Sequence, residues 1–182
     1  MGEIYDDEKR LIRRRMQDAR RRLSAAEIGL RSTAACRRVL DLPAFDAARH
    51  VVVYAAIGNE VDPMLIAETA GAAGKRVYVP VPDRIRFEFV PTTAGAPTLT
   101  AAAEHVLFVV PGVAFDEHGG RLGRGDGWYD RALAPHALHP RLGLAYEFQL
   151  VPTLPQAPWD IRMHAVVTEE RVVGGLAKEK HL

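Results

Sequence analysis

Residues 111–131, PGVAFDEHGGRLGRGDGWYDR, combine six glycines with arginine, aspartate and aromatic side chains. A run of glycines lets the backbone approach a ligand closely and can turn successive N–H groups toward one anion. Residues 119–127 are therefore a candidate phosphate cradle, in which Arg121 and Arg124 would add charge-assisted hydrogen bonds. Asp130 stands where a carboxylate could hold the metal ion that accompanies a nucleotide. A glycine-rich hairpin loop with solvated charges fits the composition equally well, because the segment matches neither G-x-x-x-x-G-K-[ST] nor a G-x-G-x-x-G that follows a strand.

A basic segment near the N-terminus is the second candidate for anion binding. Eight of the fourteen residues in 9–22 are Lys or Arg, and Asp18 is the only acid. The segment is predicted to be helical, because apolar residues recur at helical spacing at Ile12, Met16, Ala19 and Leu23. Lys9 and Arg13 lie four residues apart and could reach the same anion. A solvated helix face, a grip on nucleotide phosphates and a nucleic-acid patch all remain open, although the lack of aromatic residues weakens the last.

Glu60 is a candidate ligand contact because of what precedes it. Residues 50–57, HVVVYAAI, form an apolar, β-branched run that predicts a central strand covered on both faces. A carboxylate just beyond the carboxyl end of such a strand stands where open α/β sheets place ligand contacts. A solvated acid in a turn is the alternative.

The remaining pattern alternates helices and strands. Ser24 and Glu27 form a capping box that starts a helix running to about Val39, and Asp62, followed by a proline, is predicted to cap a helix that ends at Ala73. Further strands are predicted at 76–79, 85–90, 106–110, 141–146 and 164–168, and a helix is predicted at 128–133. This alternation is typical of an α/β protein with a largely parallel sheet.

Composition limits the class of protein. The 182 residues suit one domain, 1–182, with a basic helix at 1–22 and a loose tail at 174–182. No apolar run is long enough to span a membrane, and the polar N-terminus predicts no secretory signal. The single cysteine, Cys36, excludes an internal disulfide and favours a cytoplasmic location. A net charge of +1 predicts no general attraction to nucleic acid.

Motifs along nearly the whole chain resemble those of one enzyme family. The central ones are Pro111-Gly112-x-x-Phe115-Asp116 and the segment 121–131. Further matching pieces are Lys9-x-x-x-Arg13, Gly58-Asn59-Glu60-Val61-Asp62, Gly74-Lys75, Gly143-x-Ala145-Tyr146 with Gln149, and Asp160 eight residues before Thr168-Glu169. In this order and spacing they resemble the 5-formyltetrahydrofolate cyclo-ligases, also called methenyltetrahydrofolate synthetases.

The resemblance implies both a fold and an activity. The fold would be α/β, a single three-layer domain with a mainly parallel central sheet of the type shared with ribose-phosphate isomerase and CoA-transferase domains. The activity would convert 5-formyltetrahydrofolate to 5,10-methenyltetrahydrofolate with ATP and Mg²⁺, releasing ADP and phosphate. The implied partners are these two small molecules, with no nucleic acid or membrane, and the protein is expected to be a monomer or a weak dimer.

The resemblance also implies roles for particular residues. The expected ATP-binding residues are Lys9, Arg13, Arg121, Leu122, Gly123, Arg124, Gly125, Asp126, Gly127, Trp128 and Tyr129. The expected folate contacts are Glu60, Arg124, Gly125, Asp126, Gly127 and Trp128. Phe87 and Phe89 are similar to a strand that lines the pterin pocket in the family, with Phe replacing Met, and could pack on a flat ring, although an aromatic residue in a strand more commonly packs in the core. The metal ligands would be Asp130 and Asp160, and Arg124 and Tyr129 would act in catalysis.

Three positions depart from the family pattern. Asp126 stands where Gly or Lys is common, Trp128 where Tyr is usual, and His164 where an acid is frequent. An acid beside a polyphosphate weakens binding unless a cation offsets it, and the indole replaces a hydroxyl donor and acceptor with an N–H donor. A non-catalytic paralogue that binds folate or nucleotide is therefore the alternative hypothesis.

Overall fold

The structure is a computed structural model that describes residues 2–81 and 85–175. Its helices are α1 (Gly2–Arg21), α2 (Ala25–Leu40), α3 (Pro43–Ala47), α4 (Met64–Ala72) and α5 (Trp128–Leu133), with short 3-10 turns at η1 (Ala134–His136) and η2 (Glu147–Gln149). Its strands are β1 (His50–Val52), β2 (Arg76–Pro80), β3 (Phe89–Pro91), β4 (Val106–Pro111), β5 (Ala114–Asp116), β6 (Arg121–Leu122), β7 (Arg141–Leu144), β8 (Leu150–Val151), β9 (Ala165–Val167) and β10 (Val172–Gly174). Among the helices of the described residues, none combines the length and apolar character needed to cross a membrane.

Seven strands form the central sheet in the order β10-β9-β7-β4-β1-β2-β3. The five inner strands run parallel to one another, whereas the edge strands β10 and β3 are antiparallel to their neighbours. From β1 the chain goes to β2 on one side and later returns to β4 on the other. This reversal of strand order creates a crevice at the carboxyl ends of β1 and β4, where open α/β sheets bind ligands.

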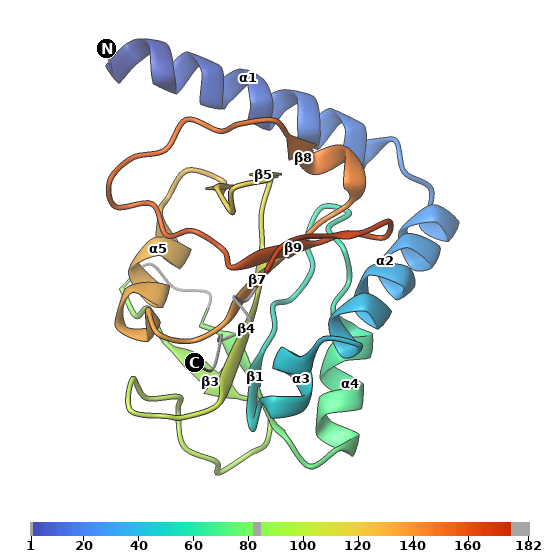
Figure 1. The fold of residues 1–182 in the computed structure, drawn as a ribbon, viewed down its shortest axis with the longest axis vertical. Helices are drawn as coiled ribbons and strands as arrows, with labels where there is room; N and C mark the ends of the chain where they lie inside the picture. Colours follow the sequence, from blue (N-terminus) through green and yellow to red (C-terminus); the bar gives the residue numbers. More distant parts are fainter. Residues whose placement is uncertain (1, 82–84, 176–182) are drawn as a thin grey trace, which may run out of the picture.

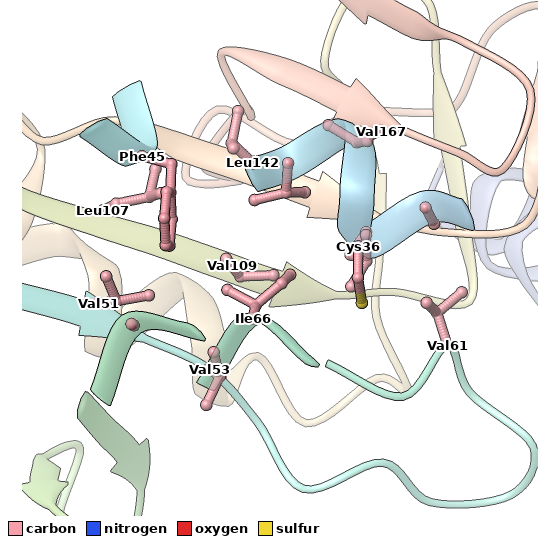
Figure 2. Close-up of a cluster of buried hydrophobic side chains, with 14 of the residues drawn as sticks. Cys36, Phe45, Val51, Val53, Val61, Ile66, Leu107, Val109, Leu142 and Val167 are labelled. Carbon is pink, nitrogen blue, oxygen red and sulfur yellow. The ribbon is translucent and has the colours of Figure 1, made fainter. Parts of the chain in front are cut away.

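Helices cover both faces of the central sheet. In β4, Leu107 and Val109 belong to a cluster with α2, α3 and α4, while Phe108 belongs to a second cluster that includes α5. Figure 1 shows α2, α3 and α4 together on one side of the strands and α5 on the other. Figure 2 shows part of the first cluster, which contains Cys36, Ile66 and Val109. The predicted three-layer α/β arrangement is confirmed.

A smaller sheet, in the order β6-β5-β8, positions the N-terminal helix. β5 and β6 form an antiparallel hairpin, and α1 lies across this sheet (Figure 1). Met16 of α1 is buried in a cluster with Ala114, Leu122 and Leu154. The predicted apolar stripe therefore fixes the basic flank of α1 beside the glycine-rich segment.

The strand predicted at 50–57 is wrong in length. Only His50–Val52 form ladders with β2 and β4, and the Val53 N–H adds one bond to Tyr78 O at 2.9 Å. Farther on, Ala55 and Ile57 are exposed and face a cleft. The apolar run continues past the strand because it forms the wall of this cleft.

Other predicted strand and helix boundaries also differ from the observed ones. The strand predicted at 85–90 reduces to the edge strand Phe89–Pro91, because Ile85 is exposed and lies outside the ladder. Pro63 rather than Asp62 occupies the N-cap position of α4, although Asp62 Oδ1 still accepts a hydrogen bond from Met64 N at 3.0 Å. β7 and β9 are slightly shorter than predicted.

Several local predictions are confirmed. Ser24 and Glu27 form the predicted capping box, and α5 spans the predicted residues. The start of the predicted loose tail is instead part of β10, which ends at Gly174, and residues 176–182 lie outside the described residues.

Candidate active site

A cleft of about 1480 Å³ opens at the carboxyl ends of β1, β2 and β4. Its walls come from the chain after these strands, from α1, from residues 121–131 and from residues 157–161. Pockets for one small molecule commonly enclose roughly 300–1000 Å³, so this cleft has room for two. It lies at the point where the strand order reverses.

The cleft gathers the residues expected to bind ATP, to contact the folate through the loop and Glu60, to hold the metal and to act in catalysis, but not Phe87, Phe89, Gly119 or Gly120. The gathered residues are Lys9, Arg13, Glu60, Arg121, Leu122, Gly123, Arg124, Gly125, Asp126, Gly127, Trp128, Tyr129, Asp130 and Asp160. The lining contains six Lys or Arg side chains against four Asp or Glu side chains, a balance of +2 that favours an anionic ligand. Their shared location is a feature of the structure, and their roles in binding remain predictions.

The glycine-rich segment divides into a hairpin turn and a loop that faces the cleft. Gly119 and Gly120 form the turn of the β5–β6 hairpin, where Asp116 Oδ1 accepts a hydrogen bond from Gly120 N at 2.7 Å. Neither glycine lines the cleft, whereas residues 123–127 do. Gly125 and Gly127 have φ values of 118° and 64°, a region that glycine adopts at little cost. The segment thus contains the hairpin of one alternative and, at 123–127, a loop that lines the cleft. The candidate phosphate cradle is confined to residues 123–127, and its binding of phosphate stays a prediction.

α1 holds this loop from one side. Arg13 Nε donates to Gly123 O at 2.9 Å, and Lys9 Nζ lies 3.4 Å from Asp160 Oδ2. The two basic side chains thus bridge α1 to two separate segments of the cleft wall. Since both also line the cleft, they are placed to meet an anion there.

Glu60 is buried between two arginines rather than solvated in a turn. Its Oε1 lies 3.3 Å from Arg20 Nη1 and 3.0 Å from Arg124 Nη2, and its Oε2 accepts a hydrogen bond from Ile57 N at 3.2 Å. The side chains of Arg20 and Glu60 are only 3% and 8% exposed, whereas that of Arg124 is 47% exposed. Arg20 is therefore the buried counter-ion of Glu60, and Arg124 is its solvent-facing partner.

Arg121 connects the loop to α5. Its Nη2 donates to Asp130 Oδ2 at 3.0 Å, and its guanidinium carbon lies 5.3 Å from the centroid of the Tyr129 ring. Burial raises the pKa of the Tyr129 phenol well above its ordinary value, with Arg121 opposing the rise and Glu60 adding to it. Tyr129 is consequently a neutral phenol at physiological pH, which suits it to hydrogen bonding rather than to proton abstraction.

The carboxylates fit a magnesium site completed by a ligand. Asp130 Oδ1 accepts a hydrogen bond from Ile161 N at 3.1 Å, so Asp130 and the chain next to Asp160 meet. Asp160 Oδ2 is bonded to Lys9 and to Ala157 N, while Oδ1 has no hydrogen bond within the described part of the chain. Across residues 2–81 and 85–175, no group of three or more His, Cys, Asp or Glu side chains is placed to hold a metal ion. Two carboxylates completed by phosphate oxygens and waters match the coordination that Mg²⁺ commonly takes.

Trp128 presents an aromatic wall to the cleft. Its ring centroid lies 5.7 Å from that of Phe89, 6.1 Å from that of Phe87 and 5.1 Å from that of Tyr129. Phe89 is 1% exposed, and neither phenylalanine lines the cleft. Of the two alternatives for these phenylalanines, the structure favours packing in the core, since Phe89 is a buried member of a hydrophobic cluster against which Phe87 and Trp128 pack.

Asp126, the unusual acid of the loop, has contacts at the start of α5. Its Oδ1 accepts a hydrogen bond from Trp128 N at 3.4 Å, and its carbonyl accepts one from Arg131 Nη2 at 2.5 Å. The carboxylate therefore has a backbone partner, and a guanidinium is held nearby by the carbonyl of the same residue.

Two residues at the site, Arg20 and Trp159, were given no individual role from the sequence. Arg20 follows Arg13 by seven residues, so helical spacing could have placed it on the same face of α1 as Lys9 and Arg13. Trp159 immediately precedes the predicted metal ligand Asp160 and is exposed at the cleft. No spacing rule connects an isolated tryptophan in a loop to a site formed by distant segments.

The fold and the cleft define a class of protein: an α/β protein with a basic cleft, walled by aromatic residues, at the point where the strand order of its sheet reverses. The model of the 5-formyltetrahydrofolate cyclo-ligase family matches residues 5–169. The chain belongs to this family, whose members are ligases.

Similar proteins agree with this assignment. The 5-formyltetrahydrofolate cyclo-ligase of Escherichia coli K12 is 34% identical, with 76% of this chain and 87% of the relative covered. A probable enzyme of this name from Caenorhabditis elegans is 25% identical over 89% of this chain and 93% of its own. Among solved structures, the 5,10-methenyltetrahydrofolate synthetase of Aquifex aeolicus has a TM-score of 0.75 and 28% identity, covering 95% of this chain and 98% of its own. The Mycoplasma pneumoniae synthetase has a TM-score of 0.74 and 25% identity, covering 88% and 98%.

Proposed function

We propose that the protein catalyses the ATP- and Mg²⁺-dependent cyclisation of 5-formyltetrahydrofolate to 5,10-methenyltetrahydrofolate. The observation that carries the proposal is the gathering of arginines, two carboxylates and an aromatic wall in one cleft with room for two ligands. Family membership supplies the substrate, and the cleft supplies groups suited to a nucleotide and to a flat ring.

The proposed chemistry needs no protein nucleophile. An amide-like formyl oxygen is a poor leaving group until it is phosphorylated. The formyl oxygen attacks the γ-phosphorus, the bond from this phosphorus to the ADP oxygen breaks, and ADP departs. N10 then bonds to the activated carbon and loses its proton, and the carbon–oxygen bond breaks to release phosphate. Such phosphoryl transfer is catalysed chiefly by positioning and charge neutralisation.

The basic residues are proposed to act on the phosphates. Lys9, Arg13 and Arg121 would bind the ATP phosphates together with the backbone of residues 122–127. Arg124 would neutralise charge on the transferring phosphoryl group. Because Arg20 also pairs with Glu60, Arg124 can turn toward a phosphate without leaving that carboxylate unpaired.

The remaining residues are proposed to hold the metal and the folate. Mg²⁺ held by Asp130 and Asp160 would supply neutralisation of the polyphosphate charge. Glu60 would accept hydrogen bonds from the pterin N–H groups, and Trp128 would pack against its ring. Tyr129, kept as a neutral phenol, would donate a hydrogen bond inside the cleft.

The test is formation of methenyltetrahydrofolate, followed by its absorbance, from ATP, Mg²⁺ and 5-formyltetrahydrofolate. We expect product with the unaltered protein and a higher Mg²⁺ requirement with Asp160→Asn, because one of two carboxylate ligands loses its charge. Asp46→Asn is the matched control, since Asp46 is exposed and lies outside the cleft. Activity of Asp160→Asn at unaltered Mg²⁺ dependence would remove the metal role.

Binding without turnover would favour the alternative function. If calorimetry shows that the folded protein binds 5-formyltetrahydrofolate or ATP and no product forms, the protein is a non-catalytic paralogue. Asp126→Gly and Trp128→Tyr together would then be expected to restore turnover, since they return the two unusual positions to the family pattern. Binding of neither ligand would refute both functions.

A further inference from the structure

The indole ring of Trp159 is exposed at the edge of the cleft. The residue is 75% exposed and lines the cleft. Its backbone lies in a turn that two hydrogen bonds close. Asp160 N donates to Ala157 O at 3.0 Å, and Ala157 N donates to Asp160 Oδ2 at 2.8 Å. Lys9 connects the same turn to α1. The indole is therefore presented at the cleft by a fixed segment.

A continuous series of contacts leads from Trp159 to the other tryptophan. Asp160 is followed by Ile161, whose N–H bonds Asp130, and Asp130 in turn bonds Arg121. Arg121 lies over Tyr129, and the rings of Tyr129 and Trp128 are in contact, with centroids 5.1 Å apart. The carboxylates and Arg121 thus form part of a series of contacts that joins the two tryptophans, both of which line the cleft.

In this series of contacts, the expected position of the folate ring and that of the nucleotide base fall at different ends. Glu60 lies at the Trp128 end of the series, because it pairs at 3.0 Å with Arg124, four residues before Trp128 in the loop. A folate ring bound by Glu60 and Trp128 would therefore occupy that end. A nucleotide whose phosphates lie at Arg121 and the two aspartates would extend its base toward the opposite end, where Trp159 stands.

We propose that Trp159 is the stacking surface for the nucleobase of ATP. This inference rests on the proposed function, because it takes the phosphates to lie between the two tryptophans. Stacking on an aromatic face does not depend on the hydrogen-bonding edge of a base. Trp159 thus strengthens binding of purine nucleoside triphosphates in general and leaves the choice between adenine and guanine to other groups.

The experiment measures Kd by calorimetry for Mg·ATP, Mg·GTP, Mg·tripolyphosphate and 5-formyltetrahydrofolate. Tripolyphosphate carries the phosphates without a base. We expect Trp159→Ala to weaken ATP and GTP binding about tenfold, a typical loss for one base–aromatic stack. It should leave tripolyphosphate and folate binding unchanged, and Trp159→Phe should recover most of the loss. Leu138→Ala is the control, because Leu138 is 96% exposed and does not line the cleft.

Fluorescence gives an independent measurement, since the chain has only two tryptophans. In Trp128→Phe the emission comes from Trp159 alone, and ATP should quench it while tripolyphosphate should not.

The outcomes separate this inference from the proposed function. If Trp159→Ala binds ATP as tightly as the unaltered protein, or loses folate or tripolyphosphate binding to the same extent, the stacking role is overturned and ATP-dependent cyclisation is unaffected. If the unaltered protein binds no Mg·ATP, the proposed function itself fails.

Discussion

Phe115 lies between two glycines, and this arrangement predicts an unusually costly glycine-to-alanine substitution. A Cβ added at Gly143 would lie 2.5 Å from Phe115 Cε1, and one added at Gly112 would lie 2.5 Å from Cζ of the same ring. Neither glycine has positive φ, so the conflict is purely steric. Phe115 is fully buried at the start of the hairpin that carries the glycine-rich loop.

The size of the effect follows from how little the ring can move. Ordinary Cβ contacts begin near 3.4 Å, so the added methyl group of Gly143→Ala overlaps the ring by about 0.9 Å. Turning away from Gly143 moves the ring toward Gly112, where space is equally short. We therefore expect a loss of about 3 kcal/mol in the free energy of unfolding, the upper end of the usual cost of overpacking.

Urea unfolding at 25 °C measures this loss, and Gly29→Ala is the matched control. Gly29 lies exposed in α2, and an added Cβ there would meet no atom within 4 Å. Replacing a helical glycine by alanine should stabilise the protein by about 0.5–1 kcal/mol. The same chemical change should therefore have opposite signs at the two sites.

Phe115→Leu tests whether the ring causes the loss. In combination with Gly143→Ala it should cost less than the sum of the two single variants, because the smaller side chain removes the overlap. A Gly143→Ala variant as stable as the unaltered protein, or strict additivity with Phe115→Leu, would refute this packing argument.

Three further predictions concern buried polar groups. Arg20→Met should cost about 1–3 kcal/mol in urea unfolding, because it removes the inner counter-ion of the buried Glu60 while Arg124 still pairs with that carboxylate, and the loss should shrink in a background of Glu60→Gln; no loss of stability would contradict a buried pair. Burial lowers the pKa of His136 from its ordinary value of 6.5, so its contribution to stability is present above pH 6.5 and is lost as the pH falls toward its folded pKa. Unfolding measured between pH 7.5 and 5.5 should accordingly depend less on pH in His136→Phe than in the unaltered protein, whereas the exposed-site control His118→Phe should change nothing; equal slopes in all three would exclude this role for His136. Burial also raises the pKa of the Cys36 thiol to about 12, and the side chain is fully buried (Figure 2), so a thiol reagent at pH 8 should label it only at the rate of unfolding; rapid labelling of the native protein would contradict the burial.

Local sequence patterns predicted much of the fold, because interactions between residues close in sequence determine where these helices begin and end. The capping box of Ser24 and Glu27 fixed the start of α2, the basic helix appeared where helical spacing placed it, and α5 spans the predicted residues 128–133. Strand ends were less predictable, because an apolar residue such as Ile57 can line a cleft as readily as a sheet. The residues at 85–88 likewise alternate in polarity without joining the ladder of β3.

Most residues of the site could be predicted from the sequence, but the contacts among them could not. Family motifs named cleft-lining residues from four distant stretches, at 9–13, 60, 121–130 and 160, and the structure brings these to one cleft. No motif indicated that Arg124 would pair with Glu60, that Arg20 would be the buried partner of the same carboxylate, or that Phe87 and Phe89 would pack against Trp128. These contacts join segments that only the sheet topology brings together.

The most direct measurement of the central claim is the ratio of ADP to methenyltetrahydrofolate formed in the same reaction. If formyl-oxygen phosphorylation drives ring closure, one ADP should appear for each methenyltetrahydrofolate, and omitting either substrate should abolish both products. Methenyltetrahydrofolate formed without ATP, or ADP released at the same rate without 5-formyltetrahydrofolate, would contradict ATP-driven cyclisation in this cleft.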